Sequence, residues 1–456
     1  MAFMFNTPAD QQAMLEAIGV NCLDELFELI PESIRQQGSL RLPPAMGELE
    51  LTQHMSALAG RNRSCAEQVC FLGGGSYDHF IPAVVDAIAG RAEFYTSYTP
   101  YQPEVSQGNL QVMFEYQTLI CQLTGMDVSN ASLYDGGSAT AEATLMAMSV
   151  TRRHGKVVVP TSLHPEYRAI VRTYLANMGT ELVEVPCPAG RLDVETVAAH
   201  VDQETACVIL QQPNFFGQLE AVQDLADVAH AHGALLIVAF DPISLGVLRK
   251  PGDQGADIVV AEGHTLGTPL SYGGPYLGIM ACREKFVRRL PGRIAGQTVD
   301  RRGRRCWVLT LQTREQHIRR DKATSNICTN QGLFALRASI YLAAMGPGGL
   351  RQTAELCVHK SRYAADTLCA DDVFSLKFTG PFVKEFVVRD TDGKVHDRLQ
   401  QAASNGIFAG IPLARWYPEL SDCFLVAVTE QRTRSDIDGW ARNLIGQEIC
   451  EGVHHA

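Results

Sequence analysis

Two positions at the ends of neighbouring predicted strands have residue types that bear on cofactor chemistry. A buried strand over residues 235–240 ends on Asp241, and the next strand, 257–261, runs into a glycine-rich turn that contains His264 and Thr265. Small ligands bind at the carboxyl ends of strands in an open α/β sheet. An acid at the first position can pair with a protonated pyridine nitrogen, and a lysine at the second can form an imine. A threonine hydroxyl cannot form an imine, so the pattern lacks the residue that would bind a cofactor covalently.

The pattern without the lysine is that of a pyridoxal-phosphate site. A glycine-rich loop leads into a helix predicted to start at Ser138 or Ala139, and it offers Gly137 and Ser138 at the helix N-terminus. Free N–H groups there favour a bound phosphate. In fold type I pyridoxal-phosphate enzymes the phosphate-binding loop lies at this point in the chain order.

A tyrosine- and proline-rich segment, residues 95–108, precedes a long amphipathic helix predicted over 109–125. Its prolines fix φ and remove backbone donors, which excludes a regular helix or a central strand. We expect a stiff loop that presents Tyr98, Tyr101, Glu104 and Gln107. A functional role on a rigid loop and a simple packing role both remain open for these side chains.

Another glycine-rich stretch, Gly73 to Gly75, can cradle an anion, although it lacks the strand-then-helix setting of a phosphate loop. A basic run over residues 301–305 is consistent with a local anion or partner site. Its more common interpretation is a solvated loop.

The elements that must position these residues alternate between strand and helix from residue 156 to 281. Such alternation predicts a mainly parallel sheet with right-handed crossovers. The predicted strands cover 157–159, 181–185, 206–211, 235–240, 257–261 and 276–281, and the helices between them cover 165–178 and 220–231.

The remaining chain divides on either side of this unit. Residues 1–70 are predicted to form a helical arm, with helices over 8–18 and 22–30, and residues 71–347 the large α/β domain. Residues 348–456 are predicted to be a small α+β domain. Its elements are helix 351–368, strands 373–378 and 385–389, helix 395–404, strand 423–428 and helix 435–445.

Composition excludes several classes of protein. The formal net charge of −11 over 456 residues argues against a nucleic-acid-binding surface. No run of eighteen apolar residues predicts a membrane span, and the amino terminus does not resemble a signal peptide. The 13 cysteines are scattered without a CxxC pair or zinc spacing, which predicts no metal site and favours reduced thiols in the cytoplasm.

Four blocks of the sequence resemble the glycine-cleavage P-protein family, glycine dehydrogenase (decarboxylating). These blocks are YTPYQPEVSQG at 98–108, TSLHPEYRAIVRTY at 161–174, SYGGPYLG at 271–278 and KATSNICTNQ at 322–331. The length and the missing lysine are similar to those of subunit 1, the amino-terminal (α) half of P proteins that are split over two chains.

The resemblance implies a fold type I pyridoxal-phosphate transferase architecture and a heterotetramer with subunit 2. Subunit 2 carries the Schiff-base lysine and holds pyridoxal phosphate covalently; glycine is decarboxylated there, and its aminomethyl group passes to the lipoyl group of H protein. Within this chain, Asp241 matches the pyridine-nitrogen partner and His164 a ring-stacking position. Because Thr265 follows His264 where a lysine is required, we expect the in-chain site to be vestigial.

Active sites of this fold lie at dimer interfaces, where one subunit completes the pocket of its neighbour. On this basis the resemblance implies that Tyr98, Tyr101, Glu104 and Gln107 belong to a shared site. The turn Thr324-Ser325-Asn326 is then expected to contact the partner's phosphate, since hydroxyl and amide donors suit an anion.

Two alternatives remain at this stage. One is a structural or regulatory subunit on a pyridoxal-phosphate fold. The other is a stand-alone decarboxylase that uses an unexpected lysine. Among Lys156, Lys250, Lys285 and Lys322, only Lys322 lies in a family-like block, and its place far beyond Asp241 argues against a Schiff base there.

Overall fold

The computed structural model describes residues 6–36, 38 and 40–446, which form two compact units divided between Arg63 and Ser64. The first unit contains helix α1 (Pro8–Ile18), the 3-10 turn η1 (Leu23–Phe27) and helix α2 (Glu48–Ala59). The helix predicted over 8–18 is confirmed. The one predicted over 22–30 is a shorter 3-10 turn, and α2 was not predicted.

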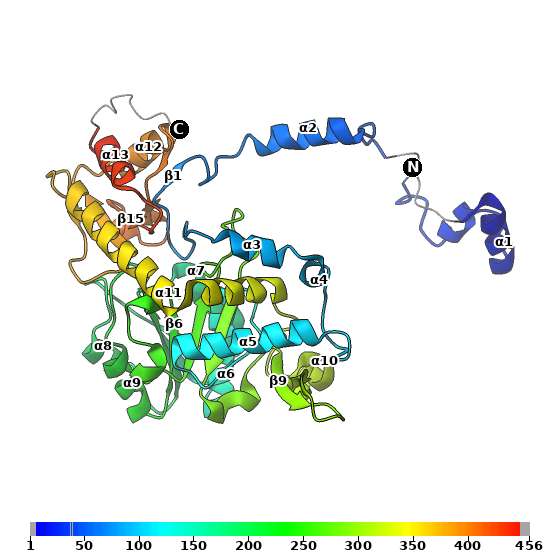
Figure 1. The fold of residues 1–456 in the computed structure, drawn as a ribbon, viewed down its shortest axis with the longest axis horizontal. Helices are drawn as coiled ribbons and strands as arrows, with labels where there is room; N and C mark the ends of the chain where they lie inside the picture. Colours follow the sequence, from blue (N-terminus) through cyan, green and yellow to red (C-terminus); the bar gives the residue numbers. More distant parts are fainter. Residues whose placement is uncertain (1–5, 37, 39, 447–456) are drawn as a thin grey trace. The chain divides into compact units, whose positions relative to one another are not determined.

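A seven-stranded sheet forms the centre of the second unit (Figure 1), in the order β2-β8-β7-β6-β5-β3-β4. The pairs from β7 through to β4 are parallel, whereas β8 is antiparallel to both β7 and β2. The predicted, mainly parallel sheet is confirmed. The strands are β2 (Val128–Ser129), β3 (Lys156–Pro160), β4 (Glu181–Val185), β5 (Thr205–Gln212), β6 (Leu235–Phe240), β7 (Ile258–Glu262) and β8 (Gly278–Cys282).

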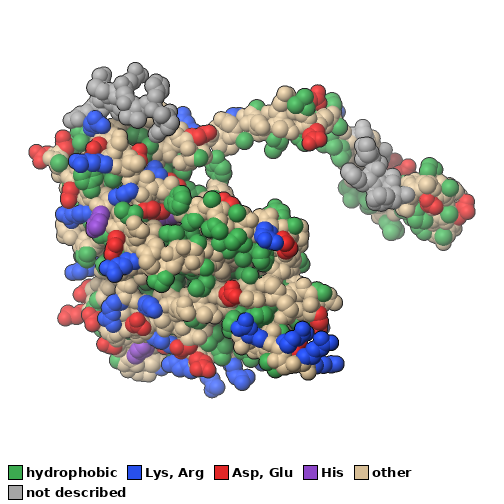
Figure 2. Space-filling view, viewed as in Figure 1, with side chains coloured by type: hydrophobic (Ala, Val, Ile, Leu, Met, Phe, Trp, Pro, Cys, Tyr) green, Lys and Arg blue, Asp and Glu red, His purple; other side chains and the backbone are tan. Residues whose placement is uncertain are grey.

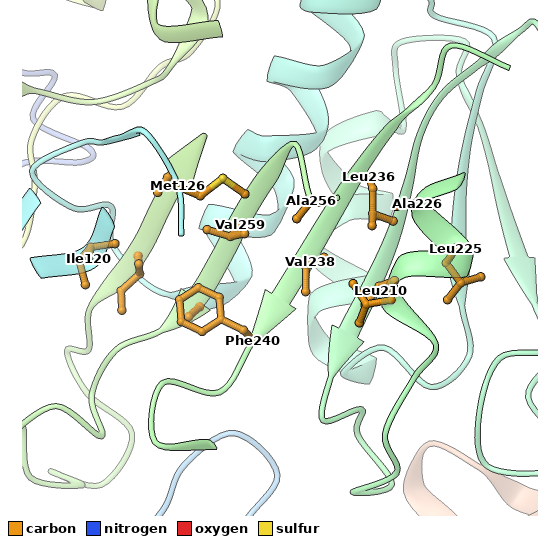
Figure 3. Packing of buried hydrophobic residues seen from close by; sticks show 14 of the residues in the cluster. Ile120, Met126, Leu210, Leu225, Ala226, Leu236, Val238, Phe240, Ala256 and Val259 are labelled. Atoms are coloured by element: carbon orange, nitrogen blue, oxygen red, sulfur yellow. The ribbon is translucent and has the colours of Figure 1, made fainter. Parts of the chain in front are cut away.

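Both faces of this sheet are buried, which explains why its strands read as continuous apolar runs. Leu210, Val238 and Val259 lie side by side in register on β5, β6 and β7, and all point toward one face. Figure 3 shows Leu210 beside Leu225 of α9 (Val222–Ala231), and Val259 and Phe240 farther along the sheet, on the side of Met126. The alternate residues of the strands pack on the opposite face against α6 (Gly136–Thr151) and α7 (Pro165–Leu175).

The other helices of this unit flank the sheet and the small domain. They are α3 (Ala83–Ala89), α4 (Ala92–Tyr95), α5 (Gln107–Thr124), α8 (Val194–Ala198), α10 (Gln316–Arg319), α11 (Gly332–Leu368), α12 (Val395–Ser404) and α13 (Arg434–Ile445). Short 3-10 turns are η2 (Ser244–Gly246), η3 (Pro251–Gln254), η4 (Glu284–Arg289), η5 (Gln312–Arg314), η6 (Arg320–Lys322), η7 (Leu413–Arg415) and η8 (Pro418–Leu420).

The long helix α11 bends where Gly346 adopts φ 59° and Pro347 follows it. Among the described residues it is the one helix long and apolar enough to cross a membrane by length and composition. Its first half contributes Ala335, Ala338 and Tyr341 to the core beneath the sheet. We therefore interpret α11 as a core helix, whose bend at Gly346 and Pro347 lies next to the predicted domain boundary at residue 348.

The small domain is built on a four-stranded antiparallel sheet in the order β11-β12-β15-β14. Its core includes Phe71, which stacks on Trp440 of α13 with a ring-centroid distance of 4.7 Å. The chain therefore contacts the small domain before it enters the large one. The strands are β11 (Phe374–Leu376), β12 (Glu385–Asp390), β14 (Ile411–Pro412), β15 (Cys423–Ala427) and the parallel pair β1 (Val69–Cys70) and β13 (Ile407–Phe408).

The arginine-rich connection contains an antiparallel hairpin, β9 (Ile294–Val299) and β10 (Arg305–Thr310), that was not predicted. Its turn is charged, and the apolar run 306–309 in β10 does not alternate with polar residues as a half-buried strand would. Lys and Arg side chains gather over this hairpin and α10 (Figure 2), and Arg301, Arg302, Arg304 and Arg305 are all exposed.

Candidate functional site

The acid at the end of β6 already has a partner from the small domain. Lys384, the residue before β12, places its Nζ 2.8 Å from Asp241 Oδ1, and the two side chains are only 3% and 11% exposed. Burial raises the pKa of Asp241, but the Lys384 charge and hydrogen bonds from Lys384 and Ser244 outweigh it, so that this pKa lies below its usual value. The lysine ammonium thus stands where a protonated ring nitrogen would have to be.

A chain of polar contacts continues from Lys384 into the small domain. Its Nζ lies 3.1 Å from His79 Nε2, and His79 Nδ1 lies 2.7 Å from Glu430 Oε2. Because an ammonium only donates, Nε2 accepts and the Nδ1 proton faces Glu430. The Tyr77 ring covers the same ammonium at 3.5 Å, a cation–π contact that further stabilises the buried charge.

His79, Cys357 and Glu430 bring three potential metal ligands within 4.8 Å of one another. The His79–Glu430 hydrogen bond already uses both groups, and the Lys384 ammonium lies against the same imidazole. A second positive charge at this place is opposed by the first. The cluster is better explained as part of the Lys384 network.

The N-terminus of α6, predicted to bind a phosphate, is occupied by carboxylates of the chain itself. Asp135 accepts from Ser138 N at 2.7 Å as the N-cap, and Glu262 Oε2 accepts from Gly136 N at 3.0 Å. Burial raises the pKa of Glu262 to about 7, against three backbone N–H groups that lower it. A Cβ on Gly136 would lie 2.2 Å from the Tyr167 hydroxyl, and the Ser138 N–H predicted to meet a phosphate is already used by Asp135.

The triple glycine holds a carboxyl group, that of Glu385. Gly74 N donates to Glu385 Oε1 at 2.7 Å, and the Tyr77 hydroxyl donates to Oε2 at 2.8 Å. Burial raises the pKa of Glu385 to about 7. The loop predicted to suit an anion thus receives the side chain of a residue of β12.

His164 and Thr265 lie in the same region, in buried positions. His164 Nε2 is 2.7 Å from Gly74 O, and its ring stacks on Tyr167 with centroids 4.6 Å apart. Burial lowers the pKa of His164. Thr265 is 3% exposed, and its hydroxyl has no hydrogen-bond partner among the described residues.

The space left between these groups is small. A cavity of about 30 Å³ remains among Asp241, Lys384, Glu385 and their neighbours, enough for one or two water molecules. The groove beside it is larger, about 420 Å³, but carboxyl groups of Asp135, Glu166 and Glu262 line it, which disfavours a phosphate. The in-chain residues therefore do not fit pyridoxal phosphate.

The predicted tyrosine loop lies open on the surface. Tyr98 is 89% and Tyr101 53% exposed, and Glu104 is exposed as well. Gln107 differs: its amide exchanges hydrogen bonds of 2.9 and 2.8 Å with the backbone N and O of Trp307. Its side chain fixes the start of α5 to β10 and does not face the solvent.

The turn at 324–326 lies in a second neighbourhood. Thr324 lines an open, basic pocket of about 280 Å³ with Arg319 and Lys322. Ser325 turns inward, where it hydrogen-bonds the buried Glu142 and accepts from Ile327 N. Asn326 is exposed. The tyrosine loop instead meets the next residues, Thr329 and Asn330, around a separate cavity of about 140 Å³.

Sequence reasoning missed Lys384, Glu262 and Glu385. The pair Lys384-Glu385 begins an apolar strand, where two charged residues usually mark its exposed end. The signal that could have found them is indirect. Without the lysine that binds the cofactor, no ring nitrogen faces Asp241, so this buried acid requires a counter-charge from elsewhere in the chain.

Comparison with known proteins shows which family the chain resembles. The model of the glycine cleavage system P-protein family matches residues 1–444. A chain named probable glycine dehydrogenase (decarboxylating) subunit 1, from Desulfitobacterium hafniense, is 50% identical over 440 residues, which cover 96% of this chain and 98% of that one.

Two solved structures are similar throughout. The crystal structure of glycine decarboxylase (P-protein) of the glycine cleavage system, in inhibitor-bound form, has a TM-score of 0.88 and 41% identity and covers 97% of this chain and 99% of its own. A C-DES mutant with glycine covalently linked to its PLP cofactor has a TM-score of 0.62 at 15% identity, covering 84% and 97%. The fold is that of fold type I pyridoxal-phosphate enzymes, and the chain belongs to the glycine cleavage system P-protein family.

Proposed function

We propose that this chain is the half of a two-chain glycine dehydrogenase (decarboxylating) that does not hold the cofactor covalently. Subunit 2 supplies the Schiff-base lysine and pyridoxal phosphate, whose ring acts as the electron sink when bound there. Together the two chains decarboxylate glycine in the cytoplasm and transfer its aminomethyl group to the lipoyl group of H protein. This chain completes the site of subunit 2 across their interface.

The observation that carries the proposal is the ion pair between Lys384 and Asp241. A fold that binds pyridoxal phosphate needs its strand-end acid free for the ring nitrogen, and here an ammonium of the same chain lies 2.8 Å from it. The positions of the Schiff-base lysine and of the phosphate are likewise taken by Thr265 and by carboxylates. A member of this family with such a pocket needs a partner for its chemistry.

What this chain offers a partner is a set of exposed donors on a stiff loop. Tyr98 and Tyr101 present exposed hydroxyl groups, and on the separate turn at 324–326 the half-buried Thr324 and the exposed Asn326 present a hydroxyl and an amide. Such donors can hold the carboxylate of glycine or the phosphate of the partner's cofactor without a covalent bond. Glu104 is exposed on the same loop, whereas Gln107 and Ser325 hold the two segments in place.

The decisive experiment assays each chain alone and then mixed, with lipoylated H protein, for release of labelled carbon dioxide from carboxyl-labelled glycine. We expect activity only in the mixture. Borohydride reduction of this chain with pyridoxal phosphate, followed by peptide mapping, should label no pocket lysine. Label on Lys384 or Lys322 would establish a stand-alone enzyme, and full activity of subunit 2 alone would leave this chain a structural or regulatory role.

Single substitutions test the surface that we propose this chain shares with subunit 2, which is formed by Tyr98, Tyr101, Thr324 and Asn326 and is called the shared surface below. Tyr101→Phe and Thr324→Ala each remove one hydroxyl, and we expect about a tenfold loss of turnover in the assembled enzyme, the equivalent of one hydrogen bond of about 1.4 kcal/mol. Tyr363→Phe in the small domain, where the hydroxyl bonds Asp438, is the control and should leave turnover unchanged. Wild-type turnover in both site variants would exclude the shared surface.

A further inference from the structure

We propose that Arg293 is a positioning residue for the shared surface, because it fastens the tyrosine loop to the segment Cys328–Asn330. The inference rests on the proposed function and extends it to a residue outside all four blocks that suggested the family. Arg293 immediately precedes β9, in the arginine-rich connection, whose function the sequence left undecided.

The backbone of Arg293 is anchored to the body of the α/β unit. Its carbonyl accepts from Ala131 N at 2.8 Å, and Ala131 O in turn accepts from Asn330 Nδ2 at 2.7 Å. The residue as a whole is 3% exposed. The side chain of Arg293 therefore extends from a backbone position that is fixed by hydrogen bonds.

The guanidinium group contacts both segments at once. Toward the loop, Nη2 lies 3.3 Å from the Tyr101 hydroxyl, and the guanidinium carbon lies 5.5 Å from the centre of the Tyr101 ring. Toward the other segment, Nη2 donates to Cys328 O at 3.0 Å, and Nη1 donates to Thr329 Oγ1 at 2.9 Å and to Asn330 Oδ1 at 3.0 Å. One planar group thus fixes a half-exposed tyrosine relative to three consecutive residues.

The cavity of about 140 Å³ lies between these two segments, and Arg293, Tyr98, Thr99, Thr329 and Asn330 are among the residues that line it. Its shape depends on the distance between the tyrosine loop and residues 328–330. Arg293 is the residue that sets this distance. Removing its guanidinium group would therefore change the shape of the cavity while Tyr98 remains in the sequence.

The charge of Arg293 supports a role beyond packing. Within the described part of the chain no carboxylate forms an ion pair with it, and its Nε has no hydrogen-bond partner. A buried charge without a counter-charge costs several kcal/mol. A neutral side chain would avoid that cost if packing were all that the position required. The planar fork of arginine, which a lysine cannot reproduce, satisfies four acceptors here.

The first test uses this chain alone. We expect Arg293→Met and Arg293→Lys to speed hydrogen exchange of the backbone amides in residues 95–106 and 328–330 by about tenfold or more, with β5 to β7 unchanged. Arg351→Met is the matched control, because Arg351 is exposed on α11 and pairs only with Glu355. Arg293→Lys keeps the charge and serves if the methionine variant does not fold. Unchanged exchange in the lysine variant would overturn the inference.

The second test uses the complex with subunit 2. We expect Arg293→Lys to lower kcat per assembled complex by up to roughly 100-fold, since a shift of about 1 Å in a positioned group has such effects. Combined with Tyr101→Phe it should cost less than the product of the two single effects, because both act through one contact. Fully multiplicative effects would overturn the positioning role.

The two tests separate this inference from the proposed function. If Tyr101→Phe lowers turnover but Arg293→Lys does not, the shared surface stands and the role of Arg293 fails. If neither variant changes turnover although the loop exchanges faster, the shared surface itself fails, and the inference fails with it.

Discussion

The pocket around Asp241 and the tyrosine loop differ in how their polar groups are paired. In the pocket, Asp241, Glu262 and Glu385 are buried and each receives a proton donor from the same chain. On the loop, Tyr98 and Tyr101 are mostly exposed, and the Tyr98 hydroxyl has no described protein partner. The three carboxyl groups of the pocket are paired within the chain, whereas the loop tyrosines are open to solvent.

The difference shows how a ligand site closes physically. A buried carboxylate that no longer faces a cofactor must find another cation or donor, because an unpaired buried charge is too costly. The small domain supplies both Lys384 and Glu385 from consecutive positions at the start of β12. The same contacts join the two domains, so the closed pocket has become part of the stability of the fold.

The largest effect should come from opening this pocket. Lys384→Met removes the ammonium and leaves Asp241 buried without a counter-charge, so we expect the free energy of unfolding to fall by about 3–5 kcal/mol. Urea unfolding of the isolated chain measures this. Adding Asp241→Asn should restore a large part of the loss, since it removes the orphaned charge. A drop below about 1 kcal/mol in the single variant would mean that the pocket depends little on this pair.

A second prediction concerns Glu142 of α6, whose carboxyl group hydrogen-bonds Ser325 and so connects this helix to the turn at 324–326. Burial raises the pKa of Glu142 from 4.5 to about 7, and its Oε2 has no partner among the described residues. The folded chain therefore binds a proton that the unfolded chain has already released between pH 4.5 and 7, and wild-type stability falls as pH rises through this window.

Glu142→Gln removes this titration. We expect the variant to match wild type near pH 4, below the unfolded pKa, and to exceed it by up to about 3 kcal/mol above pH 7, as measured by urea unfolding across that range. Glu355→Gln, on the exposed side of α11, should differ from wild type by less than about 0.5 kcal/mol at every pH. A difference that does not grow with pH would show that the carboxyl group keeps its ordinary pKa in the folded chain.

Most of the large-domain sheet could be predicted from sequence, because buried parallel strands such as 235–240 are continuous apolar runs with glycine-rich ends. The β9–β10 hairpin was missed, since its turn is arginine-rich and the apolar run 306–309 in β10 does not show the period of two. Helix α2 was missed although Leu51, Met55 and Leu58 recur at helical spacing; all three are exposed in the structure.

The partners of the candidate residues could not be predicted from the sequence. Asp241, His164 and Thr265 could be placed at strand and helix ends from local pattern, and Asp241 and His164 line one cavity. Lys384 comes from another domain, 143 residues along the chain from Asp241, and no local pattern reports such a pair. Gln107 and Ser325 were placed on the right segments, but only the fold shows that their side chains turn inward.

The smallest effect tests the position where the lysine is missing. The Thr265 hydroxyl is buried and unpaired, so Thr265→Val should raise the free energy of unfolding by about 1 kcal/mol. Thr140→Val is the matched control with the opposite sign, because the Thr140 hydroxyl donates to Gly136 O at 2.8 Å and its loss should cost about 1 kcal/mol. Both variants should keep the turnover of the assembled enzyme. If Thr265→Val instead lowered turnover at unchanged stability, the hydroxyl would have a role in the reaction, and the contrast between a closed pocket and an open loop would not hold.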